Sequence, residues 1–223
     1  MAVNKEVYLQ IVDELKVAEV VLVAVSKTKP VADLEELYQL GQRDFGENYV
    51  QELVDKEAVL PKDIRWHFIG HLQSNKVKYI APFVHLIHGV DSYKLLQEIN
   101  KQAAKNNRVI DCLLQVHIAQ EETKFGFDQQ ELDVLIRECA DMQMKNINII
   151  GLMGMASFSD DLQKVRSEFK NLKTIFDKLK TYNLPLTTLS MGMSGDYKIA
   201  IEEGSTMVRI GSLLFGAREY AKL

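Results

Sequence analysis

Short runs of apolar and β-branched residues alternate with longer amphipathic stretches along the whole chain. These runs predict eight strands, over residues 20–27, 43–47, 64–70, 84–90, 110–118, 147–155, 187–193 and 207–215. Several runs, such as VVLVAV and CLLQV, are almost continuously apolar, which is typical of strands covered on both faces of a parallel sheet.

The stretches between these runs carry apolar residues at helical spacing. Leu34 and Leu37 precede Gly41, and apolar residues recur every three or four positions over 169–179. Eight strands alternating with helices favour a single (β/α)8 TIM barrel that takes in residues 1–223. A doubly wound open sheet is the alternative, but no G-x-G-x-x-G motif follows the first strand.

Composition excludes several classes of protein. Hydrophobic residues make up 47% and charged residues 26% of the 223 positions, as in ordinary globular domains. The formal net charge is -4 with the basic residues dispersed, so we expect no nucleic-acid partner. No apolar run approaches the roughly 20 residues of a membrane span, and no signal peptide is recognisable, so we expect a cytoplasmic protein. Cys112 and Cys139 are predicted to be buried, reduced thiols.

Polar residues that follow the strands of such a barrel meet at one rim, where active sites lie. The first strand ends in Ser26-Lys27-Thr28-Lys29-Pro30. Lys27 shares a face of the predicted strand with Val23 and Val25, so its amine is partly desolvated. Desolvation disfavours the ammonium form, and a neutral amine can hold an aldehyde as a Schiff base. The alternative is that Lys27 only ends the strand and extends into solvent.

Small residues gather after the seventh predicted strand and within the eighth, where barrels commonly bind phosphate. Their hydroxyls and backbone N–H groups suit an anion, and a short helix predicted over 196–203, ended by Gly204, would begin beside them. The alternative is that the glycines only permit tight turns. The candidate phosphate ligands are Gly192, Ser194, Gly211 and Ser212, and Ser190 beside them is a further candidate for cofactor binding.

Arg209 lies inside the apolar run MVRIG, where an unpaired guanidinium would be costly. Its partner is predicted to be either a carboxylate such as Glu47 or the ring nitrogen of a cofactor. In pyridoxal 5'-phosphate (PLP), a ring nitrogen that faces arginine stays unprotonated, which weakens the cofactor as an electron sink.

Other strand ends contribute further candidates around the mouth. Asn48 suits the phenolic oxygen of PLP, His71 follows the third strand, and Met153 with Met155 offers apolar contact to the ring, although methionine is more often core filling. Lys124 is a second amine past the fifth strand, and we treat it as peripheral. The five histidines lack the spacing of a metal site, so we predict none.

Several longer motifs occur in a specific order: VAVSKTKP, FGENYVQE, WHFIGHLQSNK, GLMGM, SMGMS and GSTMVRIGSLLFGAREY. With them the chain resembles, over nearly its whole length, the YggS/PROSC family of pyridoxal phosphate homeostasis proteins. The resemblance implies a single barrel akin to the N-terminal domain of alanine racemase, with PLP held by Lys27. It also implies that Arg209 faces the pyridine nitrogen, that Ser194, Gly211 and Ser212 bind phosphate, and that Asn48 and His71 line the mouth.

Three functional hypotheses follow. The first is a PLP carrier that takes part in vitamin B6 and amino-acid homeostasis, with PLP-dependent apo-enzymes as partners and a monomeric state. The second is a weak single-domain amino-acid racemase, which the absence of a second domain and of a placed tyrosine disfavours. The third is a barrel enzyme that acts on a sugar phosphate through a Schiff base on Lys27. We favour the first, without a defined catalytic activity.

Overall fold

The computed structural model describes residues 3–119, 125–141, 144–182 and 184–216, with side chains for all of these except 136–141. Within them, eight parallel strands close into a barrel in which each strand pairs with the next and β8 pairs with β1. The predicted TIM barrel is confirmed, and the open sheet is wrong. The strands are β1 (Val21–Val25), β2 (Asp44–Glu47), β3 (Arg65–Phe68), β4 (Leu86–Val90), β5 (Ile110–Gln115), β6 (Ile147–Met153), β7 (Thr188–Met193) and β8 (Met207–Ile210).

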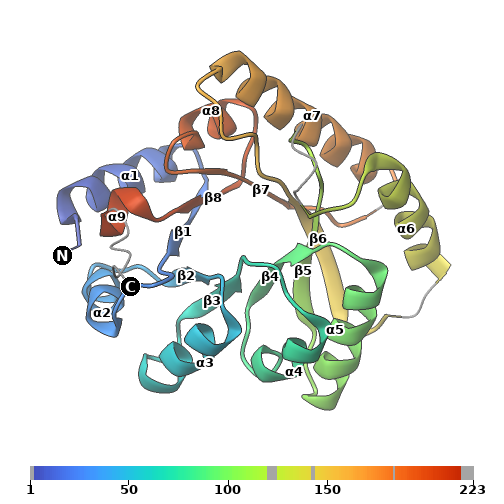
Figure 1. Cartoon of the computed structure of the whole chain (residues 1–223), viewed down its shortest axis with the longest axis horizontal. Coiled ribbons are helices and arrows are strands. Elements are labelled where there is room, and N and C mark those ends of the chain that lie inside the picture. The colour runs from blue at the N-terminus through green and yellow to red at the C-terminus, as the bar shows by residue number, and fades with distance from the viewer. Residues whose placement is uncertain (1–2, 120–124, 142–143, 183, 217–223) are drawn as a thin grey trace, which may run out of the picture.

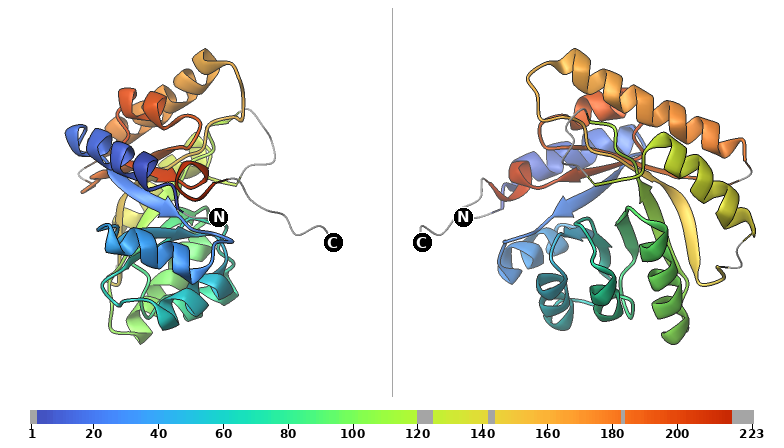
Figure 2. Two further views of the ribbon diagram at one scale, coloured as in Figure 1. Left: turned by 90° about the vertical axis from the view of Figure 1, so that its left-hand side faces the viewer. Right: turned by 45° about the vertical axis from the view of Figure 1, so that its right-hand side comes forward.

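Helices surround the barrel on the outside (Figure 1; Figure 2). Most begin a few residues after a strand and return the chain to the start of the next, as the alternation predicts. Among the described residues, no helix combines the length and the apolar character needed to cross a bilayer. The helices are α1 (Lys5–Val17), α2 (Val31–Gln39), α3 (Val50–Val59), the 3-10 turn η1 (Ser74–Lys76), α4 (Val77–Ile80), α5 (Tyr93–Lys105), α6 (Gln129–Asp141), α7 (Leu162–Lys180), α8 (Tyr197–Glu202) and α9 (Ser212–Phe215).

The apolar core has two parts, because side chains alternate between the faces of each strand. A small cluster joins residues from five strands on different sides of the barrel, and these side chains can meet only in its interior. A much larger cluster lies between the strands and the outer helices. The small cluster consists of Val23, Leu86, Leu113, Met153 and Met207.

Strand ends differ most from the prediction at the carboxyl end of the barrel. β1 ends at Val25, before Lys27, and β5 ends at Gln115 rather than at residue 118. The predicted strand over 207–215 is wrong beyond Ile210, where the chain turns at Gly211 and forms α9. The apolar run continues there because Leu214 and Phe215 are buried in the core.

The two ends of the described chain meet beside β1. α9 lies against α1, although they come from opposite ends of the sequence (Figure 1). The Asn4 N–H donates to the Leu214 carbonyl over 2.8 Å. This contact holds the start of α9 at the barrel mouth, next to the loop that follows β1.

Candidate functional site

A cavity of about 380 Å³ opens at the carboxyl ends of the strands, in the usual size range for a small ligand. It brings together residues from six strand ends that are distant in sequence. Six residues predicted for the site line it: Lys27, Asn48, Ser194, Arg209, Gly211 and Ser212. The site therefore assembles where the strand-end argument places it.

Lys27 lies in a tight turn directly after β1 and is half-buried. Both neighbours of Lys27 are anchored to acidic side chains: Ser26 Oγ donates to Glu47 Oε1 over 2.6 Å, and the Thr28 N–H donates to Glu52 Oε1 over 2.6 Å. Thr28 has a φ of 64°, a conformation that costs a β-branched residue energy. The anchors thus hold the backbone on both sides of Lys27.

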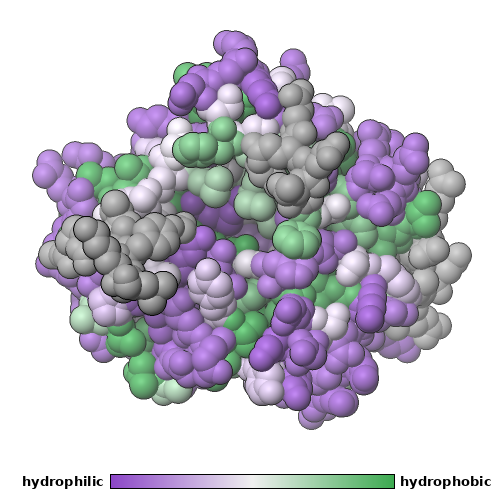
Figure 3. All heavy atoms as spheres, viewed as in Figure 1, coloured by the Kyte–Doolittle hydropathy of each residue, from purple (hydrophilic) through white to green (hydrophobic). Residues whose placement is uncertain are grey.

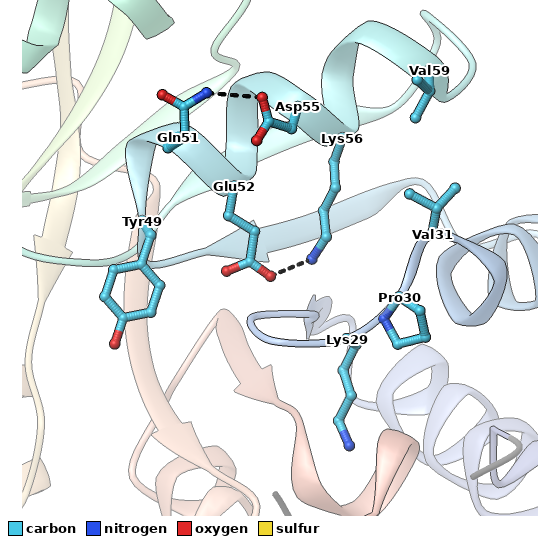
Figure 4. Close-up of a pocket in the computed structure, with 9 residues that line it drawn as sticks. All are labelled: Lys29, Pro30, Val31, Tyr49, Gln51, Glu52, Asp55, Lys56 and Val59. Carbon is cyan, nitrogen blue, oxygen red and sulfur yellow. Dashed lines mark hydrogen bonds and ion pairs between the residues drawn. The ribbon is translucent and has the colours of Figure 1, made fainter. Parts of the chain in front are cut away.

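Lys56 completes this anchor from α3. Its buried Nζ donates to the Ser26 carbonyl over 2.8 Å and forms ion pairs of 2.7 Å with both Glu47 and Glu52. Figure 4 shows Lys56 and Glu52 pointing toward each other beside the loop that carries Lys29 and Pro30. Burial raises the pKa of Glu47, and the ammonium of Lys56 opposes that change. We call Glu47, Glu52 and Lys56 the acidic anchor.

Lys29 also borders the cavity but has a different task. Its Nζ donates to the Phe215 carbonyl over 2.7 Å, so the side chain extends toward α9. In Figure 4 it points away from the acidic anchor. Lys29 thereby ties the loop after β1 to the last described helix, whereas Lys27 faces the cavity.

The β7 and β8 side of the cavity is built from small residues. Ser194 Oγ accepts a hydrogen bond of 3.2 Å from the Gly211 N–H. A Cβ at Gly211 would lie 3.0 Å from the Val25 carbonyl oxygen, so the strands can approach only because the residue is glycine. Ser212 is exposed at the start of α9. Hydroxyls and backbone N–H groups here can hold an anion.

Arg209 forms the floor of the cavity and is 4% exposed. Among the described residues, its Nη1 donates to Ser190 Oγ over 2.6 Å and its Nη2 to the Gly154 carbonyl over 3.1 Å. The prediction that Glu47 pairs with Arg209 is therefore wrong, because the Glu47 carboxylate accepts from Ser26 and forms an ion pair with Lys56. Burial lowers the pKa of Arg209 to about 10, with Asp196 opposing, so the guanidinium remains charged at neutral pH.

Four predicted residues lie outside the cavity lining. Ser190 is buried beneath Arg209, and Met153 belongs to the inner apolar cluster, while Met155 lines the cavity in its place. Gly192 has a φ of 95°, and a Cβ there would lie 2.6 Å from Ala200 Cβ, so it permits α8 to pack. His71 borders a neighbouring cavity, where its Nδ1 lies 3.0 Å from Asp91 and its ring stacks on Phe125.

Other predictions concern residues away from the mouth. Cys112 is buried, and burial raises the pKa of its thiol, so it is an unreactive core residue. Lys124 and the side chain of Cys139 lie outside the described residues. Among the described residues, no group of three or more His, Cys, Asp or Glu is placed to hold a metal ion.

Sequence reasoning missed two groups that support the site. The acidic anchor includes Glu52 and Lys56, whose spacing on α3 is also typical of an ordinary surface ion pair. A buried polar chain from Asp44 through His67 and His88 to Ser190 also went unpredicted. Its only signal in the sequence is the presence of His67 and His88 within predicted strands.

The residues present fit PLP. Asn48 Oδ1 is buried without a partner, beside the cavity, so this side-chain amide can turn and donate from its N–H₂ to the phenolic oxygen of a ligand. Lys27 can hold an aldehyde, and the small residues of β7 and β8 offer donors to a phosphate. Arg209 occupies the floor between them, where a heteroaromatic ring nitrogen can accept from it.

The closed barrel and this mouth define the class: a (β/α)8 barrel protein with a cavity at the carboxyl ends of its strands, lined by a lysine, an arginine and small residues. Residues 9–219 match the family described as alanine racemase, N-terminal domain, and the chain belongs to that family.

Curated relatives carry a more particular name. The chain is 45% identical over 201 residues to the pyridoxal phosphate homeostasis protein of Aquifex aeolicus (strain VF5), covering 89% of this chain and 87% of that protein. It is 38% identical over 208 residues to the protein of the same name from Escherichia coli (strain K12), covering 92% and 88%. The resemblance to this group of proteins is thus confirmed.

Solved structures agree with the fold. PipY of Synechococcus elongatus PCC7942, solved with PLP bound, superimposes with a TM-score of 0.87 at 36% identity over 95% of this chain and 99% of that chain. Alanine racemase of Clostridium difficile 630 has a TM-score of 0.79 at 14% identity, over 98% of this chain but 59% of that chain. The second likeness shows the fold alone.

Proposed function

We propose that this protein binds PLP at the barrel mouth, with Lys27 holding the aldehyde as a Schiff base, and serves in intracellular PLP homeostasis. The observation that carries the proposal is the presence, in one cavity, of Lys27 after β1 together with the small residues Ser194 and Gly211 after β7 and β8. An aldehyde group and a phosphate on one small molecule satisfy both sides at once.

The other polar residues of the cavity suit the remaining atoms of PLP. Asn48 would donate from its amide N–H₂ to the phenolic oxygen, and the Arg209 guanidinium would donate to the ring nitrogen. When bound, PLP supplies an electron sink whose strength depends on protonation of that nitrogen. Arg209 keeps its proton at neutral pH and so leaves the nitrogen unprotonated, which favours storage of the cofactor over rapid carbanion chemistry.

The relatives support the same function. The protein from Aquifex aeolicus is named for pyridoxal phosphate homeostasis and covers nearly the same length, and PipY has been solved with PLP. Likeness to alanine racemase shows the barrel only, so we do not extend racemisation to this chain. Transfer of PLP to apo-enzymes, a monomeric state and a cytoplasmic location stay predictions.

Absorption spectroscopy of the protein mixed with PLP tests the proposal. We expect a visible imine band that is lost in Lys27→Ala, because Lys29, the other described lysine that lines this cavity, donates its Nζ to the Phe215 carbonyl. Lys29→Ala is the matched control, since Lys29 lies two positions away and its Nζ is bound to the Phe215 carbonyl. An imine band that survives in Lys27→Ala and disappears in Lys29→Ala would contradict the assignment.

A further inference from the structure

A continuous polar chain crosses the interior of the barrel from its amino-terminal rim to the cavity floor. Asp44 begins β2, and its carboxylate lies 3.0 Å from His67 Nε2. His67 Nδ1 lies 3.0 Å from His88 Nε2, and His88 Nδ1 lies 3.1 Å from Ser190 Oγ. Ser190 Oγ then accepts from Arg209 Nη1 over 2.6 Å.

With both imidazoles neutral, the chemistry of the two ends sets the direction of every hydrogen bond between them. An ionised Asp44 carboxylate only accepts, so His67 Nε2 carries a hydrogen. A neutral His67 then accepts at Nδ1, which requires a hydrogen on His88 Nε2 and leaves His88 Nδ1 as an acceptor. Ser190 must therefore donate to His88 while it accepts from Arg209.

Burial supports a neutral His88. His88 is fully buried, and burial lowers its pKa well below 6.5, with the guanidinium of Arg209 acting in the same direction. At the far end, burial alone would raise the pKa of Asp44, but hydrogen bonds from His67 and Arg65 outweigh it and lower the pKa to about 2. Asp44 is thus ionised at neutral pH.

We propose that Asp44 positions Arg209 through this one-way chain, with His67, His88 and Ser190 as the intermediate positioning residues. Each bond in the series is polarised toward the carboxylate, so Ser190 becomes a stronger acceptor for the guanidinium. The hydrogen-bonded chain thereby orients Arg209 toward the cavity from the barrel interior. The inference rests on the proposed function in one respect, namely that Arg209 faces the ring nitrogen of PLP.

Nitrogen-15 NMR of the imidazoles in the PLP-free protein tests the chain directly. We expect both His67 and His88 to be neutral with the hydrogen on Nε2. In Asp44→Asn, Arg65 retains the amide oxygen and the amide N–H₂ turns toward His67, so both rings should change together to the Nδ1–H form. A hydrogen on Nδ1 of either ring in the wild type, or a change confined to His67, would overturn the proposal.

PLP binding tests the effect on Arg209. Ser190→Ala removes the acceptor of Arg209 Nη1, and we expect about tenfold weaker PLP binding with a shifted imine absorption band. Asp44→Asn should produce a shift of the same kind with about twofold weaker binding, because its influence passes through the chain. His85→Gln is the matched control: the exposed His85 ring touches His67 by its edge but forms no bond of the chain, so affinity and spectrum should not change.

The outcomes separate this inference from the proposed function. Unchanged affinity and spectrum in Ser190→Ala and Asp44→Asn, with an intact imine on Lys27, would overturn the positioning role and leave PLP binding in place. Absence of PLP binding by the wild type would overturn the proposed function. The NMR measurement would still decide whether the hydrogen-bonded chain from Asp44 to Arg209 has the proposed direction. Thermal melts of each variant distinguish a loss of folding from a loss of Arg209 positioning.

Discussion

The two walls of the cavity hold their functional groups by opposite means. On the β1 side, the acidic anchor fixes the backbone around Lys27 with buried charges, and Glu47 is completely inaccessible to solvent. On the β7 and β8 side, Ser194 and Gly211 are only half-buried and carry no charge. The strained turn at Thr28 thus has a buried ionic anchor, whereas the proposed phosphate site offers neutral donors near solvent.

The largest expected effect is on the free energy of unfolding, and it comes from a substitution in the acidic anchor on the β1 side. Lys56→Met leaves Glu47 buried without its cation, and we expect a loss of about 3–5 kcal/mol in the free energy of unfolding, measured by urea titration. Lys62→Met is the control, because Lys62 pairs with Glu57 at the surface and its loss should cost about 1 kcal/mol at most. Equal destabilisation by the two variants would contradict a special role for the acidic anchor.

A substitution at Ser194, on the β7 and β8 side of the cavity, should change the affinity for PLP rather than the stability of the fold. Ser194→Ala removes a hydroxyl from the proposed phosphate site, and we expect about tenfold weaker PLP binding by equilibrium titration, with an unchanged melting temperature. Ser167→Ala removes a hydroxyl on α7 that bonds only the Lys164 carbonyl and should leave affinity unchanged. If Ser194→Ala unfolded the protein instead, the contrast between the walls would be wrong.

The last prediction concerns the pH dependence of stability that His88 causes beneath the cavity floor. Because the folded protein keeps His88 neutral, its pKa lies below the value of 6.5 in the unfolded chain. As pH falls below 6.5 the unfolded state binds the proton first, so stability decreases by at most about 1.4 kcal/mol per pH unit for this group. Urea titrations at pH 7 and pH 5 should show a smaller decrease in His88→Leu than in the wild type. An identical decrease in both proteins would rule out a buried neutral His88.

The parts of the molecule that sequence alone predicts are those set by periodicity. Strand ends converge at one rim of any parallel barrel, so Lys27, Asn48 and Arg209 could be placed together from their positions after or within apolar runs. His71 follows the same rule but enters a neighbouring cavity, because the loop after β3 carries it toward Asp91. Alternation therefore places the rim, and loop geometry decides which residues face the ligand.

Support for the site depends on contacts that no local pattern carries. The link from His67 to His88 requires the register of β3 against β4, and the link to Ser190 requires a contact across the barrel interior. Lys56 reaches the Lys27 loop only because α3 packs beside β2. On the face shown in Figure 3, apolar residues form separate patches among hydrophilic ones, so surface composition does not mark the site either.

Peptide mass spectrometry of the protein after incubation with PLP and reduction with borohydride tests the central claim most directly, because it reports the adduct and its position together. The account predicts one phosphopyridoxyl group on the peptide that carries Lys27 and none at this cavity in Lys27→Ala. A reduced adduct on Lys29 in the wild type, with Lys27 unmodified, would contradict it.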